Sequence, residues 1–277
     1  MISLIICSRK TILSEELSQN INDTIGNQYE LILIDNSKSS YSIFEAYNIG
    51  IKKSKGDILC FIHDDILFHT DKWGLILESE FKENPSFALI GIAGAKVKTQ
   101  FPTGWWDCEN KYKVVNIIQH EKVKVERQFF GFTDDNLQET LVIDGVFMAL
   151  KCEEDFLFDT HLTGFHNYDL SLSSDVKTKG KKVGVTKKIL LEHLSIGKLN
   201  EDWFFSTILF HKKYYKSLKD NNSTSEQEIF AGKKYIDHCL HTLGKKKGLI
   251  YVLSVFKFSI SIKVNFILGK YILSRLI

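Results

Sequence analysis

The chain has 277 residues and a formal charge of +2, with 36 Lys and Arg residues against 34 Asp and Glu residues. Its hydrophobic share of 44% and charged share of 25% are typical of a globular protein and argue against disorder, collagen-like repeats and multiple membrane spans. The five scattered cysteines include no C-x-x-C pair, which favours reduced thiols over a disulfide framework. At the N-terminus the positive charges follow the apolar run instead of preceding it, so we expect a cytoplasmic location without a signal peptide.

The net charge hides an asymmetry along the chain. Seven cations and no acid follow position 243, which leaves 29 cations against 34 acids, or −5, for residues 1–243. A nucleic-acid-binding protein would instead be basic across its binding face. We therefore expect no nucleic-acid partner, and a mildly acidic body that carries a basic, apolar C-terminal end.

Short apolar runs alternate with helical spacing in the first part of the chain. Residues 2–7, 30–34 and 58–62 are β-branched runs typical of strands that are buried on both faces of a parallel sheet. Between them, residues 13–25 and 43–53 have helical spacing. This order predicts an α/β fold with a mostly parallel, doubly wound central sheet flanked by helices.

The later elements follow from the same periodicities. Residues 94–112, rich in glycine and aromatic residues, are predicted to form a long loop, and residues 219–228 a polar loop. The predicted helices cover residues 72–83, 168–179 and 201–218, and the predicted strands cover residues 87–92, 113–128, 140–151, 182–186 and 189–192.

Residues 219–277 are expected to form a helical extension beyond a main domain of residues 1–218. Lysines interrupt the apolar segment 248–277, so a membrane-spanning helix is disfavoured. The polar residues of this segment do not cluster on one side of a helical wheel. Two interpretations stay open: a helix packed on the body or on a second subunit of a homodimer, or an in-plane helix held at the inner face of the cell membrane by apolar burial and lysine charge.

Polar side chains crowd the edge of the predicted sheet at which open α/β sheets bind their ligands. The first three strands end at Ser8 and Arg9, at Asp35 and Asn36, and at residues 63–65. No G-x-G-x-x-G motif follows the first strand and no P-loop motif occurs anywhere, so neither a dinucleotide site nor a P-loop site is supported.

His63, Asp64 and Asp65 follow the third apolar run without a break. Two adjacent carboxylates repel each other unless a cation or hydrogen-bond donors compensate. A divalent cation that bridges to substrate phosphates is the simplest compensation, and Mg²⁺ or Mn²⁺ suits oxygen ligands. The alternative is a turn in which an Asp caps the following helix.

In their order and spacing, several segments resemble the GT-A glycosyltransferases, in particular the family-2 group of inverting enzymes. The matching segments are residues 3–9, 31–37, 46–50, 55–57 and 61–65. The last of these stands where the family carries D-x-D, with His63 in place of the first Asp. This histidine and the later segments look most like the subgroup named after a streptomycin-biosynthesis protein, and the resemblance covers about residues 1–215.

The resemblance implies a nucleotide-sugar donor, a UDP-sugar foremost, and assigns residues to it. Asp35 would hydrogen-bond the nucleobase. Asp65 would bind Mn²⁺ or Mg²⁺, with His63 and His193 close to the metal. The other residues that the resemblance places at the nucleotide are Ser8, Arg9, Asn36, Asn48 and Asp64.

Asp169 falls where the family places its catalytic base, at the start of a helix beneath the acceptor. Such a group is needed because a sugar hydroxyl is a poor nucleophile until a positioned carboxylate removes its proton. The positive end of the helix predicts that Asp169 is ionised at neutral pH. A helix-capping role is compatible with this assignment, and Ser171 stands where the subgroup often has a second acid.

The resemblance also implies contacts with the donor or acceptor sugar at Asp144 and Gly145, where a glycine would allow close approach. Trp105, like Trp106, would stack on a sugar ring, although core packing is the commoner use of tryptophan. His166 lies close to the base in sequence and would orient an acceptor.

The expected activity is that of a hexosyltransferase-type enzyme acting on a glycan or lipid-linked acceptor, as in polysaccharide biosynthesis. A different class stays open: a non-catalytic nucleotide- or glycan-binding protein on a degenerate GT-A fold, which His63 and Ser171 would favour. A sugar-phosphate nucleotidyltransferase is set aside because residues 8–12 lack the glycines of the loop that such an enzyme needs.

Overall fold

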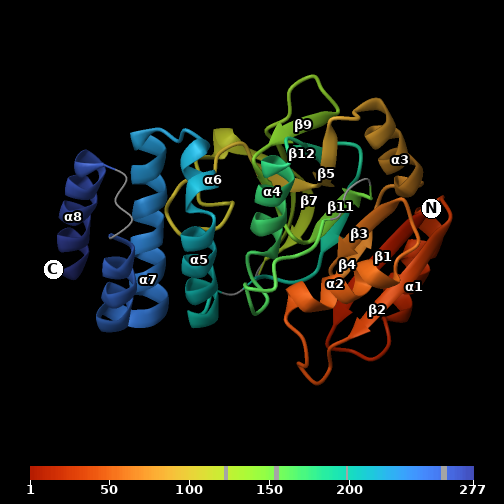
Figure 1. Cartoon of the computed structure of the whole chain (residues 1–277), viewed down its shortest axis with the longest axis horizontal. Coiled ribbons are helices and arrows are strands. Elements are labelled where there is room, and N and C mark those ends of the chain that lie inside the picture. Colours follow the sequence, from red (N-terminus) through yellow and green to blue (C-terminus); the bar gives the residue numbers. More distant parts are fainter. Residues whose placement is uncertain (122–123, 153–155, 198, 257–260) are drawn as a thin grey trace.

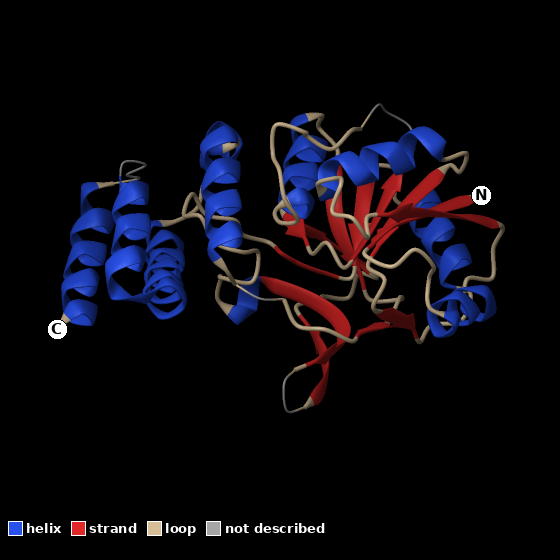
Figure 2. Cartoon of the chain, turned by 90° about the horizontal axis from the view of Figure 1, so that it is seen from below, coloured by secondary structure: helices blue, strands red, loops and turns tan. Residues whose placement is uncertain are grey.

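The computed structural model describes residues 1–121, 124–152, 156–197, 199–256 and 261–277. In this part of the chain, a mixed sheet carries helices on both faces, and further helices extend from one side of it toward the C-terminus (Figure 1 and Figure 2). The α/β class predicted from the sequence is therefore confirmed.

The main sheet has seven strands in the order β2-β1-β3-β11-β5-β12-β9. The neighbours β2, β1 and β3 are parallel, whereas β11 is antiparallel to both β3 and β5. The strands are β1 (Ile2–Ser8), β2 (Tyr29–Asp35), β3 (Ile58–Ile62), β5 (Phe87–Gly91), β9 (Leu137–Thr140), β11 (Phe147–Lys151) and β12 (Lys182–Thr186). The runs 2–7, 30–34 and 58–62 thus form the strands expected of them.

Successive residues of a central strand enter different hydrophobic cores, because side chains alternate across a sheet. In β3, Leu59 and Phe61 pack in the core under α2 (Ile43–Lys53) and α4 (Tyr168–Thr178), whereas Cys60 packs in the core under α1 (Glu15–Thr24) and α3 (Trp73–Glu83). All five residues of β3 are buried. The continuous apolar run therefore reflects burial on two faces.

The second sheet has six strands, in the order β10-β6-β7-β13-β4 with β8 paired to β7. The segment 113–128, predicted as one strand, contains the two strands of an antiparallel pair, and the predicted loop 94–112 begins within β6 and includes a short 3₁₀ helix at Asn110–Tyr112. β4 was not predicted at all. The strands are β4 (Ile66–Phe68), β6 (Ala93–Ala95), β7 (Lys113–His120), β8 (Val125–Phe130), β10 (Val142–Ile143) and β13 (Leu191–His193).

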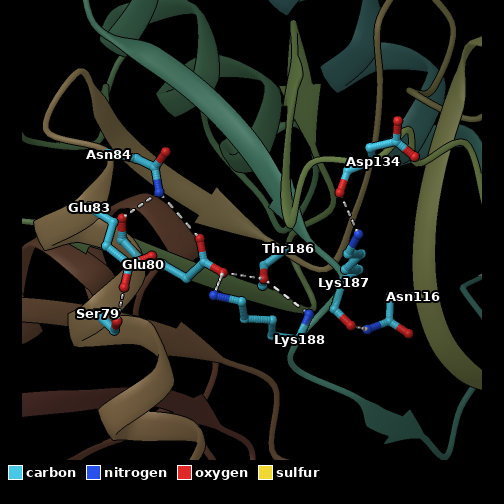
Figure 3. Close-up of polar contacts among 9 residues, drawn as sticks. All are labelled: Ser79, Glu80, Glu83, Asn84, Asn116, Asp134, Thr186, Lys187 and Lys188. Carbon is cyan, nitrogen blue, oxygen red and sulfur yellow. Dashed lines mark hydrogen bonds and ion pairs between the residues drawn. The ribbon is translucent and has the colours of Figure 1, made fainter.

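Buried polar contacts fix the segment that leads into β13 (Figure 3). Glu80 of α3, 1% exposed, accepts a hydrogen bond from Thr186 and lies 3.1 Å from Lys188 Nζ. The Asn116 amide of β7 donates to the carbonyls of Lys187 and Ile189 at 3.0 and 2.6 Å. These contacts hold the chain in place a few residues before His193.

The C-terminal helices are α5 (Glu201–Lys213), α6 (Tyr215–Asp220), α7 (Ser225–Val255) and α8 (Ile262–Leu276). The predicted helix 201–218 is interrupted at Tyr214, and the predicted loop 219–228 is shorter because Thr224 and Gln227 form a capping box that starts α7. Gly244, at φ 77°, breaks α7 into two helical stretches.

A third hydrophobic core joins these helices. It includes Trp203 and Phe204 of α5 together with residues of α7 and α8. The proposed boundary at residue 218 therefore divides two elements that share a core, and it stays a prediction. Over the residues described, no helix combines the length and the hydropathy needed to cross a membrane.

Candidate active site

Three side chains with metal-binding atoms meet where β3 and β13 end. Asp65 Oδ1 lies 3.7 Å from His63 Nδ1 and 3.5 Å from His193 Nε2. One ligand atom of each residue lies within 4.8 Å of the others. The structure thus brings together the three residues that the sequence analysis assigned to a metal.

The donor set of this cluster fits a divalent cation. His193 Nδ1 lies 3.1 Å from Gln119 Oε1, to which it can only donate, so Nε2 carries the lone pair. That Nε2 is buried and has no hydrogen-bond partner among the described residues. A buried lone pair beside a carboxylate and a second imidazole is what a metal ligand needs.

The surroundings shift the pKa values of His63 and Asp65 in this cluster. Burial and the charge of His193 lower the pKa of His63, so that its imidazole is neutral. Burial acts to raise the pKa of Asp65, but hydrogen-bonding contacts, and the positive charge that either histidine carries when it is protonated, hold it well below its usual range. Neutral imidazoles and an ionised carboxylate are the forms that ligate metals.

Tyr168, at the start of α4, is a site residue that the sequence analysis missed. Its hydroxyl lies 2.7 Å from His63 Nε2. When Nε2–H donates to this hydroxyl, the lone pair of Nδ1 faces Asp65. A Cβ at Gly145 would lie 2.3 Å from the Tyr168 hydroxyl oxygen. The group that approaches Gly145 closely is therefore the protein's own Tyr168, and any larger residue at position 145 would clash with it.

Asp169 lies in the first turn of α4, half-buried. Asn167, at φ 63°, occupies the N-cap position without a capping hydrogen bond, and its amide donates to the hydroxyls of Ser206 and Thr207 on α5. Asp169 Oδ1 accepts from the Leu170 N–H at 2.8 Å. Burial and the neighbouring charge of Asp144 raise the pKa of Asp169 to about 7. The sequence predicted that Asp169 is ionised at neutral pH. A pKa of about 7 differs from this prediction, because desolvation and the charge of Asp144 raise the pKa by more than the helix N-terminus lowers it.

The candidate base Asp169 and the two candidate metal ligands His63 and His193 line the same cavity, which has a volume of about 620 Å³. Asp144 also lines this cavity, together with Asp169, His63 and His193. The acidic and imidazole groups that are far apart in the sequence therefore share one cleft.

Aromatic residues form much of the remaining wall. The Trp105 indole donates to Asp144 Oδ2 at 2.6 Å, which fixes both side chains. Trp106, 37% exposed, stands near Trp203 of α5, with ring centroids 6.1 Å apart. Phe165 and Trp203 also line the cavity but were not singled out from the sequence, because their spacing looked like that of a loop and of an ordinary buried helix face.

His166 lies in the same wall, and burial lowers its pKa. A neutral imidazole can both donate and accept a hydrogen bond, as contact with a sugar hydroxyl requires. The position agrees with the expected place of an acceptor contact, and the role itself stays a prediction.

Except for Asn48, which lies on α2, the residues expected at the nucleotide lie at the ends of β1, β2 and β3. The buried Ser8 hydroxyl donates to Asp64, so these neighbouring strand ends are in contact. Arg9 is exposed, with its guanidinium 5.9 Å from the centre of the Phe165 ring. Asp35 is exposed, and hydrogen bonds from Ser37 lower its pKa.

Asn36 and Asn48 are engaged by the protein's own backbone. The Asn36 amide donates to the Tyr41 carbonyl at 2.9 Å and accepts from its N–H at 3.0 Å. Asn48 makes the same pair of contacts with Phe158, each at 2.8 Å. Both side chains thus hold neighbouring loops, and the nucleotide contact expected of them stays a prediction.

Comparison with solved structures places this fold. The crystal structure of GalNAc-T7 with UDP, GalNAc and Mn²⁺ is similar with a TM-score of 0.56 and 12% identity over 96% of this chain. This chain spans 57% of the length of that one. The crystal structure of A197 from STIV is similar over 70% of this chain and 86% of that one, with 13% identity and a TM-score of 0.41. The likeness to GalNAc-T7 confirms the predicted GT-A fold with its C-terminal helices.

Comparison with sequences identifies the family. Among curated proteins no match is found. A family model described as a glycosyltransferase-like family matches residues 3–231, which is most of the chain. The finer subgroup expected from the sequence, named after a streptomycin-biosynthesis protein, stays a prediction. From its fold and from this match, the chain belongs to the glycosyltransferase-like family.

Proposed function

We propose that this protein is an inverting, metal-dependent glycosyltransferase of the hexosyltransferase type. It would transfer a sugar from a nucleotide sugar, a UDP-sugar foremost, to a hydroxyl of a glycan or lipid-linked acceptor. The observation that carries the proposal is that Asp169 and the metal-binding histidines line one cavity.

His63, Asp65 and His193 would hold the cation. Two imidazoles and one carboxylate suit Mn²⁺ better than Mg²⁺, which prefers oxygen ligands. The chemistry that such a cation supplies is neutralisation of the charge that develops on the departing nucleoside diphosphate.

Asp169 would act as the general base. Its carboxylate removes the proton of the acceptor hydroxyl while the oxygen attacks the anomeric carbon, and the bond to the diphosphate oxygen breaks. A pKa of about 7 is well matched to this task, because the ideal base titrates near the working pH. Both oxygens of the neighbouring Asp144 accept hydrogen bonds, from Trp105 and from the Val146 N–H, which favours Asp169 as the base.

The test separates binding from chemistry. Calorimetry with UDP, GDP and dTDP in the presence of Mn²⁺ should show binding, and Asp65→Ala should abolish its metal dependence. Asp169→Asn should keep binding but lose transfer. The anomeric configuration of the product, read by NMR, should be inverted.

Three outcomes would contradict parts of the proposal. Full activity of Asp169→Asn would remove the base assignment, and a product of retained configuration would remove the inverting mechanism. Nucleotide binding without transfer or donor hydrolysis would favour the non-catalytic binding protein instead.

A further inference from the structure

The outer surface of the C-terminal helices carries apolar side chains that the fold leaves exposed. On α8, Ile262, Phe266 and Leu273 are 90%, 63% and 63% exposed, and Ile277, which directly follows the helix, is 104% exposed. At about 100° per residue, these positions fall within about 60° of the helix circumference. We name these four residues the outer stripe.

The outer stripe is held outward by the packing of the opposite side of α8. Val264, Leu268 and Ile272 are buried in the third hydrophobic core. Leu268 seats against Gly232 of α7, where an added Cβ would lie 2.5 Å from its Cδ1. The Tyr271 hydroxyl donates to Asp237 at 2.8 Å and Arg275 lies 3.1 Å from the same carboxylate. The orientation of α8 is therefore fixed on two sides.

Cations flank the outer stripe. Lys263 and Lys270 are exposed, and Lys270 Nζ lies 4.5 Å from the centre of the Phe266 ring. Asp237 is the last acidic residue of the chain. Ile250 and Leu253 are two further exposed apolar side chains. They lie in the second stretch of α7, which begins with three successive lysines. Lys257, another cation of this segment, lies outside the described residues.

We propose that the outer stripe docks on the surface of an anionic lipid bilayer, with α8 lying in the plane of the membrane. Apolar side chains on one helix face would enter the acyl boundary, while the adjacent lysines reach the anionic headgroups. A second copy of this chain is disfavoured as the occupant, because a symmetric contact would bring two sets of cations together without an acid from this segment. α8 lies at the far end of the molecule from β1 and β2 in both views (Figure 1 and Figure 2).

This proposal goes beyond glycosyl transfer and does not depend on it. Co-sedimentation of the full chain with phosphatidylcholine vesicles, with and without one third phosphatidylglycerol, tests it directly. We expect binding to the anionic vesicles that weakens as salt is added, and little binding to the neutral ones.

Substitutions locate the surface. The pair Phe266→Ser and Leu273→Ser should weaken vesicle binding by about tenfold per side chain, because buried apolar area is lost. Lys263→Gln and Lys270→Gln should each weaken it about fivefold. The matched controls are Leu75→Ser, an exposed leucine of α3, and the pair Lys52→Gln and Lys53→Gln on α2, all of which should bind as the parent chain does.

Sedimentation velocity on the same proteins distinguishes lipid from a second copy. A monomer that binds anionic vesicles through the outer stripe supports the proposal. Absence of vesicle binding, equal binding to neutral vesicles, or a dimer that the Phe266→Ser and Leu273→Ser pair dissociates would overturn it.

Discussion

The central sheet and the C-terminal helices bury their apolar residues in different ways. The strands of the main sheet have a hydrophobic core on each face, so every residue of an uninterrupted apolar run such as β3 is buried. α8 has one core, yet it is apolar on two sides, with Leu268 inside and Phe266 outside. Apolar residues on opposite sides of a helix cancel in a helical wheel, which is why no face was predicted there. The comparison teaches that an apolar segment without a clear face can have two faces with different partners.

The largest effect on activity is expected from the proposed base, Asp169, at the edge of the sheet. Asp169→Asn keeps the shape of the side chain but cannot take a proton, so kcat should fall about 10²- to 10⁴-fold while nucleotide affinity is unchanged. Asp175→Asn is the matched control, because that carboxyl lies on the same helix and accepts from Tyr214 away from the cavity. Equal losses in both variants would indicate damage to α4 instead of loss of a base.

The next effect sharpens the contrast between the two sides of α8. Leu268→Ala leaves a cavity in the third core and should lower the free energy of unfolding by about 2–5 kcal/mol. Leu273→Ala, on the outer stripe of the same helix, should change it by less than about 0.5 kcal/mol. Chemical denaturation of both variants measures the difference, and a similar cost for the two would contradict the orientation of α8.

A smaller effect is expected from the tyrosine that holds His63. Tyr168→Phe removes the hydroxyl 2.7 Å from Nε2 and should weaken Mn²⁺ binding about 10- to 100-fold, measured by calorimetry without donor or acceptor. Tyr214→Phe also removes a hydroxyl, one that donates to the partly buried Asp175 carboxylate. Tyr214 lies outside the cluster of His63, Asp65 and His193, so this variant should leave Mn²⁺ affinity unchanged. Unchanged affinity in Tyr168→Phe would show that His63 needs no such partner.

The smallest change concerns the titration of Asp169. In the metal-free protein its carboxyl should titrate at about pH 7, followed by carbon NMR, so that the carboxylate gains population as the pH rises through 7. Asp144→Asn removes the neighbouring negative charge and should move this titration to lower pH, leaving the contribution of burial. A titration that stays in place would assign the whole shift to burial.

The strands of the sheet could be predicted from the sequence because their apolar runs reflect burial, but their directions could not. The central sheet was expected to be mostly parallel, whereas β11 is antiparallel to β3 and β5, and β9 is antiparallel to β12. Asp65, His63 and His193 were assigned through the family resemblance, and the structure places them together. β4 was missed because three residues are too few to show a period. The contact of the Asn48 amide with the Phe158 backbone could not be predicted, because a motif carries no information about a segment 110 positions away.

Tyr168 and Trp203 could not be found from the sequence because their roles depend on contacts between distant segments. Nothing local relates Tyr168 to His63, which is 105 positions away. The glycine at position 145 was noticed, but the ring that it accommodates was not.

Trp203 both lines the candidate active-site cavity and belongs to the third hydrophobic core. A chain cut at residue 218 would remove the partners that α7 and α8 supply to this ring, and the cavity wall that Trp203 forms would lose its support. Truncation would thus confound membrane attachment with substrate selection. Conversely, α8 packs on α7 and α7 packs on α5, so a displacement of α8 at a lipid surface would be transmitted to Trp203 in the cavity wall.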